Sequence, residues 1–317
     1  MAVVAGGVGA ARMLAALSQV VEAETIAAIA NVGDDLELHG LRISPDLDTI
    51  TYTLAGAINT ETGWGLTGES WQAMDTVRLY GGIDWFGLGD RDLGTHLYRT
   101  QRLSEGATLS EVTAEITAAW QIGVQVLPVT DDRLRTMVTL ADSPGADPSV
   151  DPTSPIEITF QEYFVQRRHS VPVASVRFDG AAGARPGPEV IGALERAERV
   201  IIAPSNPVVS IDPVLAVPGV RSAIENRRSD VVAVSPIVAG AALKGPADRL
   251  LRELGHRADV VGVARMYAPL AATLVIDEAD AELADAVAAE GIRPLVTPTV
   301  MSRPGVSRSL AEAVLGA

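Results

Sequence analysis

The chain has 317 residues, 47% of them hydrophobic, so it can bury one large core or two modest ones. Its formal charge of −15 argues against nucleic acid or an anionic membrane surface as the main partner, because both repel an acidic protein. The absence of cysteine excludes a disulfide framework, a thiolate zinc site and a cysteine nucleophile. We find neither a signal peptide pattern nor a run of the roughly 20 apolar residues that a membrane span needs, so we expect a cytoplasmic protein.

The first predicted elements surround a glycine-rich loop in the stretch "MAVVAGGVGAARML". A short apolar strand ends at Gly6, Gly7 and Gly9, and a helix can start over residues 10–17. Backbone N–H groups at such a helix start can face an anion. The spacing therefore favours a nucleotide-phosphate loop, with a plain structural turn as the alternative.

This loop fits neither of the two standard nucleotide fingerprints. The dinucleotide motif needs its third glycine where this chain has Arg12, and the lysine that ends a P-loop is absent. The next apolar run ends at Asn31, where a Rossmann dehydrogenase would place the acid that binds ribose. A phosphate loop here must be of another type.

Carboxylates follow the second apolar run and recur about a dozen residues later. "NVGDDLELHG" contains Asp34 and Asp35, and "SPDLDT" contains Asp46, Asp48 and Thr49. Hard oxygen ligands without cysteine or clustered histidine favour Mg²⁺. The alternative is that these acids only cap helices.

The residue pattern changes over residues 51–164 and suggests an inserted α+β segment. The stretch 109–120 is typical of a helix, and the Pro-, Asp- and Gly-rich stretch 141–155 is typical of an exposed loop or hairpin. We expect the aromatic residues of this segment to form its own core, with a minority lining a pocket for a flat ring. They are Tyr52, Trp64, Trp71, Tyr80, Trp85, Phe86 and Tyr98.

The motif "GLGDRDLGTH" gathers charged residues behind a glycine-punctuated loop. Arg91 can present a bidentate fork to an anion while Asp90 and Asp92 hold it in place. A structural network of arginine and aspartate is the alternative. His96 alone is more typical of a hydrogen-bonded packing residue than of a base.

The second half of the chain alternates apolar runs with helical stretches, which predicts a buried, mostly parallel α/β sheet. Ligands of such sheets gather at the carboxyl ends of the strands. The turn that contains Ser205, Asn206 and Pro207 lies at one such end and can offer amides and hydroxyls to a nucleotide, or serve as a rigid turn. Beyond the N-terminal strand, the predicted strands lie in residues 25–30, 199–205, 230–236, 258–264 and 272–277.

Taken together, the motifs resemble one family. "GGVG", "NVGDD", "SPDLDT", "GLGDRDLGTH", "FQEYFV", "APSNPVVSI" and "SPIVAG" occur in the order seen in the 2-phospho-L-lactate transferases of deazaflavin coenzyme F-420 biosynthesis, whose bacterial members are called phosphoenolpyruvate transferases. The resemblance extends from Gly6 to about Gly245 and is only fold-like beyond Leu250. Ala10 and Gly94 depart from the residues common in the family, but both are small.

The resemblance implies an enzyme that joins a guanosine-diphosphate-activated three-carbon acid to the ribityl side chain of 7,8-didemethyl-8-hydroxy-5-deazariboflavin (Fo) and releases GMP. It also implies Mg²⁺ as cofactor and a homodimer. The expected fold is a Rossmann-like nucleotide-binding core over residues 1–50 and 165–317, with residues 51–164 inserted to cover the acceptor site.

The same resemblance assigns site residues by motif. The nucleotide site comprises Gly6, Gly7, Gly9, Ser205, Asn206 and Pro207. Magnesium is assigned to Asp34, Asp46 and Asp48, and the last two are also assigned to orienting or deprotonating the acceptor hydroxyl. Contacts to Fo are assigned to Asp48, Thr49, Asp90 and Arg91.

Two rival functions remain open from the sequence. A related family of nucleotide-sugar-binding regulators has a similar glycine loop and α/β core but a different element in place of "GDRDLGTH". A nicotinamide dehydrogenase is disfavoured by Arg12 and Asn31.

Overall fold

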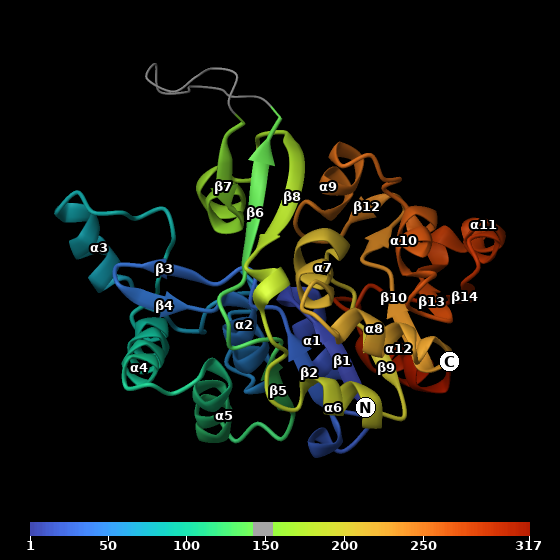
Figure 1. The fold of residues 1–317 in the computed structure, drawn as a ribbon, viewed down its shortest axis with the longest axis horizontal. Coiled ribbons are helices and arrows are strands. Elements are labelled where there is room, and N and C mark those ends of the chain that lie inside the picture. The colour runs from blue at the N-terminus through green and yellow to red at the C-terminus, as the bar shows by residue number, and fades with distance from the viewer. Residues whose placement is uncertain (142–154) are drawn as a thin grey trace.

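The computed structural model describes residues 1–141 and 155–317. Within them, a seven-stranded sheet forms the centre of the molecule (Figure 1), and every neighbouring pair of its strands is parallel. This confirms the predicted α/β fold. Its strands, in spatial order, are β14 (Arg293–Val296), β13 (Thr273–Ile276), β10 (Val231–Val234), β9 (Val200–Ile202), β1 (Ala2–Ala5), β2 (Ala27–Ala30) and β5 (Gln125–Pro128).

The strand order reverses direction between β1 and β9. From β1 the chain moves to β2 on one side, and from β9 it moves to β10 on the other. Because parallel crossovers are right-handed, helices of the two halves cover opposite faces of the sheet. Ligands of open α/β sheets bind at such a reversal, beyond the carboxyl ends of the strands.

Helices flank this sheet on both faces. On one face α1 packs against both α2 and α12, while α6 packs against α8 and α10 against α11. Their apolar faces and the strands share one continuous hydrophobic core. These helices and their shorter neighbours are α1 (Gly7–Leu17), α2 (Pro45–Leu54), α5 (Leu109–Ala119), α6 (Val190–Arg196), α7 (Asp212–Leu215), α8 (Val220–Glu225), α9 (Ala247–Glu253), α10 (Val260–Tyr267), α11 (Ala284–Ala289) and α12 (Val306–Gly316).

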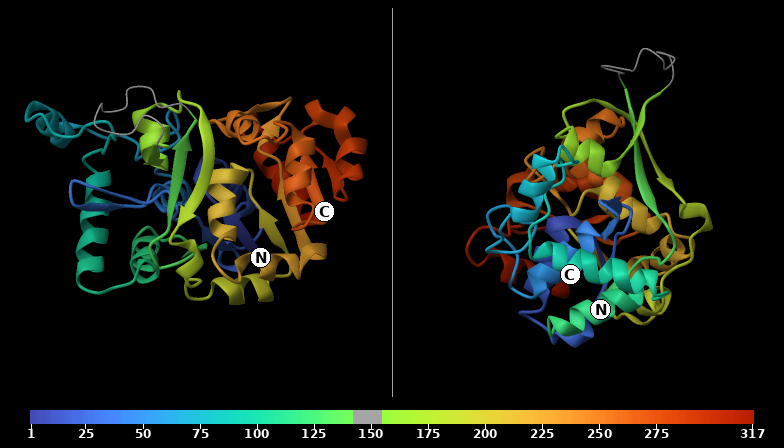
Figure 2. Two further views of the ribbon diagram at one scale, coloured as in Figure 1. Left: turned by 45° about the horizontal axis from the view of Figure 1, so that its top comes forward. Right: turned by 90° about the vertical axis from the view of Figure 1, so that its left-hand side faces the viewer.

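A segment between β2 and β5, here called the excursion, projects from the central sheet. It lies on the left of Figure 1 and of the left view of Figure 2, and it faces the viewer in the right view of Figure 2. It comprises the hairpin β3 (Leu36–Leu38) and β4 (Leu41–Ile43), with α3 (Gln72–Leu79) and α4 (Asp92–Ser104). A small separate core holds it together, formed by Leu36, Leu38, Ile43, Met74 and Leu88.

Two further small sheets complete the described fold. One has the order β7 (Glu157–Thr159), β6 (Arg135–Leu140), β8 (Val173–Asp179), and the other pairs β11 (Ile237–Val238) with β12 (Ala241–Ala242). The predicted division at residues 51 and 164 does not follow the sheets, because β5 lies inside that range and pairs with β2 in the central sheet. The division into a core and a covering segment stays a prediction.

One predicted strand is wrong. The apolar run at residues 258–264 forms part of helix α10, which begins after Asp259, whose side chain accepts a hydrogen bond from the Gly262 amide at 2.9 Å. Residues 260–264 are all buried, so this helix shows no polar face over that stretch and its sequence looks like a buried strand. The edge strand β14 was not predicted, because it is only half-buried and contains Pro294, which an edge strand tolerates.

Most aromatic residues of the middle segment lie outside its small core, against which only Trp85 and Phe86 of the seven pack; Tyr52, Trp64 and Phe86 are the predicted minority that lines a cavity. Trp64, Trp71, Tyr80 and Tyr98 are all more than 40% exposed, while Tyr52 is buried within α2. The predicted loop at 141–155 lies almost wholly outside the described residues. No helix in the described part of the chain has the length and apolar character needed to cross a membrane.

Candidate active site

A cavity of about 760 Å³ opens at the carboxyl ends of the central strands, at the reversal of strand order. Loops that follow five of those strands line it, together with α2 and the excursion. The lining includes most residues predicted for the site, namely Gly6, Gly7, Gly9, Asp34, Asp46, Asp48, Thr49, Ser205 and Asn206. The topology alone places these distant segments together.

The glycine loop joins β1 to α1, and its glycines are required by close approach and by backbone geometry. A Cβ atom on Gly6 would lie 2.9 Å from the Cβ of Ser210, and one on Gly9 would overlap the carbonyl oxygen of Pro204. Gly7 has a φ of +69°, which a residue with a side chain rarely adopts. Gly6, the N-cap residue of α1, makes no side-chain capping hydrogen bond, and the Gly7 amide is already bonded to the Asp46 carboxylate. The following amides of the first turn, from the lining residues Val8 and Gly9, offer a place for an anion.

The turn after β9 is fastened to the glycine loop. The Ser205 hydroxyl donates a hydrogen bond to the Gly6 carbonyl at 2.6 Å, and Asn206 Oδ1 accepts one from the Val208 amide at 3.0 Å. Pro207 is buried and is not among the described residues that line the cavity. It stiffens the turn rather than facing a ligand.

Asp34 and Asp46 form a buried carboxylate pair at the cavity. Asn31 Nδ2 donates a hydrogen bond to Asp46 Oδ2 at 2.9 Å, while Asp34 Oδ1 has no hydrogen-bond partner among the described residues. Burial and then the charge of Asp46 raise the pKa of Asp34 well above its ordinary value. Burial also raises the pKa of Asp46 to about 6, although hydrogen bonds from Asn31 and the Gly7 amide act in the opposite direction.

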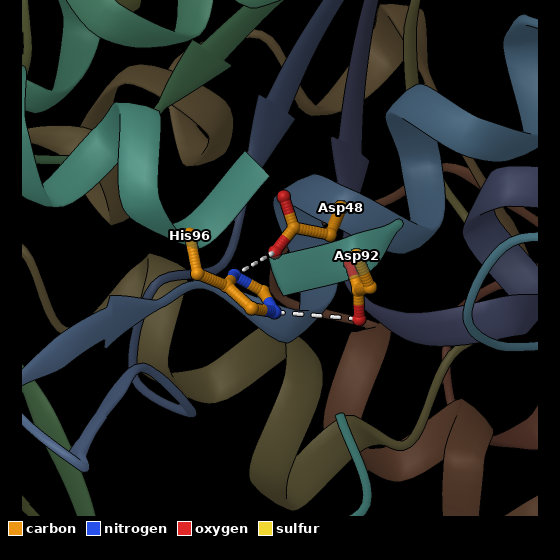
Figure 3. A group of neighbouring side chains, drawn as sticks. All are labelled: Asp48, Asp92 and His96. Atoms are coloured by element: carbon orange, nitrogen blue, oxygen red, sulfur yellow. Dashed lines mark ion pairs between the residues drawn. The ribbon is translucent and has the colours of Figure 1, made fainter. Parts of the chain in front are cut away.

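Asp48 lies in a different environment from Asp46, although both are in the first turn of α2. Both of its oxygens contact the guanidinium of Arg99, with Nη1 3.1 Å from Oδ2 and Nη2 close to Oδ1. His96 lies between two acids (Figure 3), with Nδ1 3.7 Å from Asp48 and Nε2 3.3 Å from Asp92. The Tyr52 hydroxyl donates to Asp92 at 2.6 Å. The result is a largely buried network along one wall, in which one guanidinium and one imidazole contact two carboxylates.

These contacts separate the three predicted magnesium ligands into a pair, Asp34 and Asp46, and a single residue, Asp48. The unsatisfied oxygen of Asp34 and the adjacent carboxylate of Asp46 suit a hard divalent cation, which would offset their mutual repulsion. Asp48 instead belongs to a cluster with Asp92 and His96, whose ligand atoms lie within 4.8 Å of one another. Because Arg99 already neutralises Asp48, that cluster is less suited to a cation than the Asp34 and Asp46 pair.

Helix capping does not account for the acids of the cavity. Ser44 precedes α2 at the capping position, and no side chain makes a capping hydrogen bond there. Asp46 and Asp48 lie inside the first turn, where a negative charge is favoured by the helix dipole.

Asp90 and Arg91 do not belong to the described cavity lining. Asp90 accepts hydrogen bonds from the amides of Gln72 and Ala73, both at 3.0 Å, and so caps α3. Arg91 is exposed and donates to the Thr67 carbonyl at 2.6 Å. In this structure both residues fasten the excursion, and their contact with Fo stays a prediction.

Several lining residues were not singled out from the sequence. Phe160 and Phe164 stack with ring centroids 5.4 Å apart and add an aromatic wall, to which Trp64 and Phe86 also contribute. Arg99, which contacts the lining residue Asp48 but does not itself line the cavity, was missed because that partner is 51 residues away. The helical spacing of Asp92, His96 and Arg99 in "DLGTHLYR" was the available signal, since i, i+4 and i+3 positions share one helix face.

Comparison with known proteins decides the family. The family model described as 2-phospho-L-lactate transferase CofD matches residues 1–304. The chain belongs to this family. The family expected from the motifs is therefore confirmed, and the protein is a transferase of the CofD type. The expected end of the resemblance near Leu250 was wrong, because the match continues to residue 304.

Relatives of the CofD-family chain match along its whole length. A phosphoenolpyruvate transferase of Nocardia farcinica is 42% identical over 317 residues, which cover 99% of this chain and 93% of that protein. One of Streptomyces griseus is 42% identical over 315 residues, covering 99% and 96%. A solved structure from Bacillus halodurans, a member of the UPF0052 family, has a TM-score of 0.59 at 15% identity and covers 99% of this chain and 97% of that one. The last likeness concerns the fold alone.

Proposed function

We propose that this CofD-family protein transfers a phosphoenolpyruvyl or 2-phospholactyl group from a guanosine-diphosphate-activated donor to the ribityl hydroxyl of Fo, in coenzyme F-420 biosynthesis. The acceptor hydroxyl attacks the phosphorus that bears the three-carbon acid. The bond from that phosphorus to the bridging oxygen of GMP breaks, GMP leaves, and the hydroxyl proton passes to a base.

One observation carries this proposal: the glycine loop, the buried acids and the aromatic wall line the same cavity. The amides that follow Gly7 in the first turn of α1 suit a diphosphate, and the aromatic side chains suit a flat ring system. Transfer of a substituted phosphate needs mainly positioning and charge neutralisation, which such a cavity can supply.

The acids of the cavity have separate roles in this proposal, namely metal binding and orientation of the acceptor hydroxyl. Mg²⁺, held by Asp34 and Asp46, would offset the negative charge of the diphosphate. Asp48, held beside Arg99 at the cavity, is placed to accept a hydrogen bond from the acceptor hydroxyl and so to orient it. The proton goes to one of the two carboxylates on α2, Asp46 or Asp48.

Mass spectrometry of the product tests the proposal. Fo is incubated with guanosine diphosphate esterified with enolpyruvate, lactate or glycerate, and GMP is measured alongside. We expect GMP release to require both Fo and Mg²⁺ and to stop with a chelator. Release that is independent of Fo, or binding of NAD or a UDP-sugar more tightly than GDP in calorimetry, would contradict the proposal.

A further inference from the structure

Two cationic side chains from distant parts of the chain meet at the cavity. Arg12 extends from α1, and Lys244, the only lysine of the sequence, lies between β12 and α9. Burial lowers the pKa of Lys244, and the positive charge of Arg12 lowers it further. In a protein of net charge −15, like charges are brought together here rather than spread over acidic surface.

Lys244 also holds a loop of the excursion across the cavity. Its Nζ atom donates to the Thr62 carbonyl, and it lies so close to Gly63 that a Cβ atom there would overlap it. Gly63 has a φ of +75°, and a Cβ on it would also lie 3.4 Å from Val8 in the glycine loop. The ammonium group is therefore positioned between the excursion and the glycine loop.

Neither cation has an acidic partner in residues 1–141 and 155–317. No ion pair involves Arg12 or Lys244 there, and Glu61, which lines the same cavity, pairs with neither. By contrast, the guanidinium of Arg99, behind the lining residue Asp48, forms an ion pair with that carboxylate. Two neighbouring cations without a carboxylate repel each other, and a bound anion would remove that cost.

We propose that Arg12 and Lys244 form a subsite for an oxyanion of the donor, either its terminal phosphate or the carboxylate of its three-carbon acid. This inference rests on the proposed function, which supplies a donor with both groups. The guanidinium can bind two oxygens at once, while the ammonium acts as a compact point charge. Such a subsite would explain why Lys244 lines a cavity that also contains several carboxylates.

Calorimetry with a ligand series tests the subsite and identifies the oxyanion. The ligands are GMP, GDP and GDP esterified at its terminal phosphate with lactate, each titrated into the parent, Lys244→Met and Arg12→Met. Arg185→Met is the matched control, because it removes one positive charge from a side chain that is 86% exposed and outside the cavity lining. Thermal melting checks that every variant is folded.

Along the series from GMP to GDP to the lactate ester, one ligand is the first to contain the oxyanion that the subsite binds. We expect each cavity variant to bind that ligand about tenfold more weakly than the parent does, and the control variant to bind it equally well. A loss that begins with GDP identifies the terminal phosphate, and one that begins with the lactate ester identifies the carboxylate. Lys244→Arg should retain most of the affinity. Parental affinities of both cavity variants for all three ligands would overturn the subsite while leaving the transferase proposal standing.

The single lysine allows a second test that does not depend on guanine binding. An amine-reactive reagent modifies Lys244 and the Met1 amine, which peptide mass spectrometry distinguishes. Phosphoenolpyruvate carries both oxyanions and should slow labelling of Lys244 at least about threefold in the parent but not in Arg12→Met. Protection without guanine binding would support the subsite and contradict the proposed donor, whereas equal protection of Met1 and Lys244 would contradict the subsite.

Discussion

Asp46 and Asp48 show how two acids on one helix turn acquire different properties from their contacts. Asp46 faces another buried carboxylate, Asp34, and its pKa is raised to about 6 chiefly by burial. Asp48 faces a guanidinium that contacts both of its oxygens. Removing the negative charge should therefore have opposite effects on stability at the two positions.

Asp46→Asn keeps the shape of the side chain and an oxygen that can accept the hydrogen bond from Asn31. We expect at least about 100-fold slower GMP release if the carboxylate acts on the reacting groups as proposed. Thermal stability should be equal or higher, because the repulsion of Asp34 is removed. GMP release and the melting temperature are measured on the same preparations, and a clear fall in melting temperature would contradict this account.

Asp48→Asn should lower the stability of the protein and also slow GMP release. Arg99 is only 2% exposed, and the loss of its ionised partner should cost about 3–5 kcal/mol. Denaturant unfolding measures this cost, and the double variant with Arg99→Gln should recover part of it because no buried charge is then unpaired. If Asp48→Asn unfolds like the parent, the ion pair does not hold α4 to α2 as described.

The sequence predicted which acids lie at the cavity but not what each contacts. Motif order identified Asp34, Asp46 and Asp48, and all three line the cavity. The pairing of Asp48 with Arg99 depends on a tertiary contact between α2 and α4, for which local spacing gives no register. That contact, rather than residue type, separates a candidate metal ligand from a member of an ion-pair network.

At the scale of elements, the meeting of α1 with the turn after β9 depends on one glycine. Gly9→Ala would place a methyl group against the Pro204 carbonyl and force the two elements apart. We expect a loss of about 1–3 kcal/mol in the free energy of unfolding, together with weaker GDP binding.

Gly94→Ala is the control for that substitution. Gly94 lies in α4, and nothing lies within 4 Å of its added Cβ. Alanine there should stabilise the protein by about 0.5–1 kcal/mol and leave GDP binding unchanged. Urea unfolding and calorimetry compare the two variants; equal effects of both would show that the contact at Gly9 is not tight.

Strands of the central sheet could be predicted from the sequence where both of their faces are buried. β1, β2, β9, β10 and β13 are short apolar runs, and the predicted ranges contain them. The same rule misassigned α10, since burial on all sides removes the polar face that marks a helix. It also overlooked β14, an edge strand with exposed ends.

At the scale of the whole molecule, the last helix supports the first. α12 packs on α1, and its Leu310, Ala311 and Val314 are fully buried. Since α1 begins at the glycine loop, the far end of the chain stabilises the helix that faces the cavity.

Leu310→Ala should lower the free energy of unfolding by about 2–5 kcal/mol, because it leaves a cavity in the shared core. GDP at about 100 times its dissociation constant should restore roughly 2.7 kcal/mol by binding the folded state. Urea unfolding with and without GDP measures both effects. A midpoint unaffected by the substitution would mean that α12 does not pack as described.

The strand order also has a consequence for how the protein is made. β1 leaves the ribosome well before β9, yet Ala2 pairs with Val200 on one of its two sides. The cavity further needs residues 299–302 for its wall, so it cannot be complete until that segment has also emerged. Until then an apolar strand edge stays open, and the nascent chain depends on protection from aggregation for most of its synthesis.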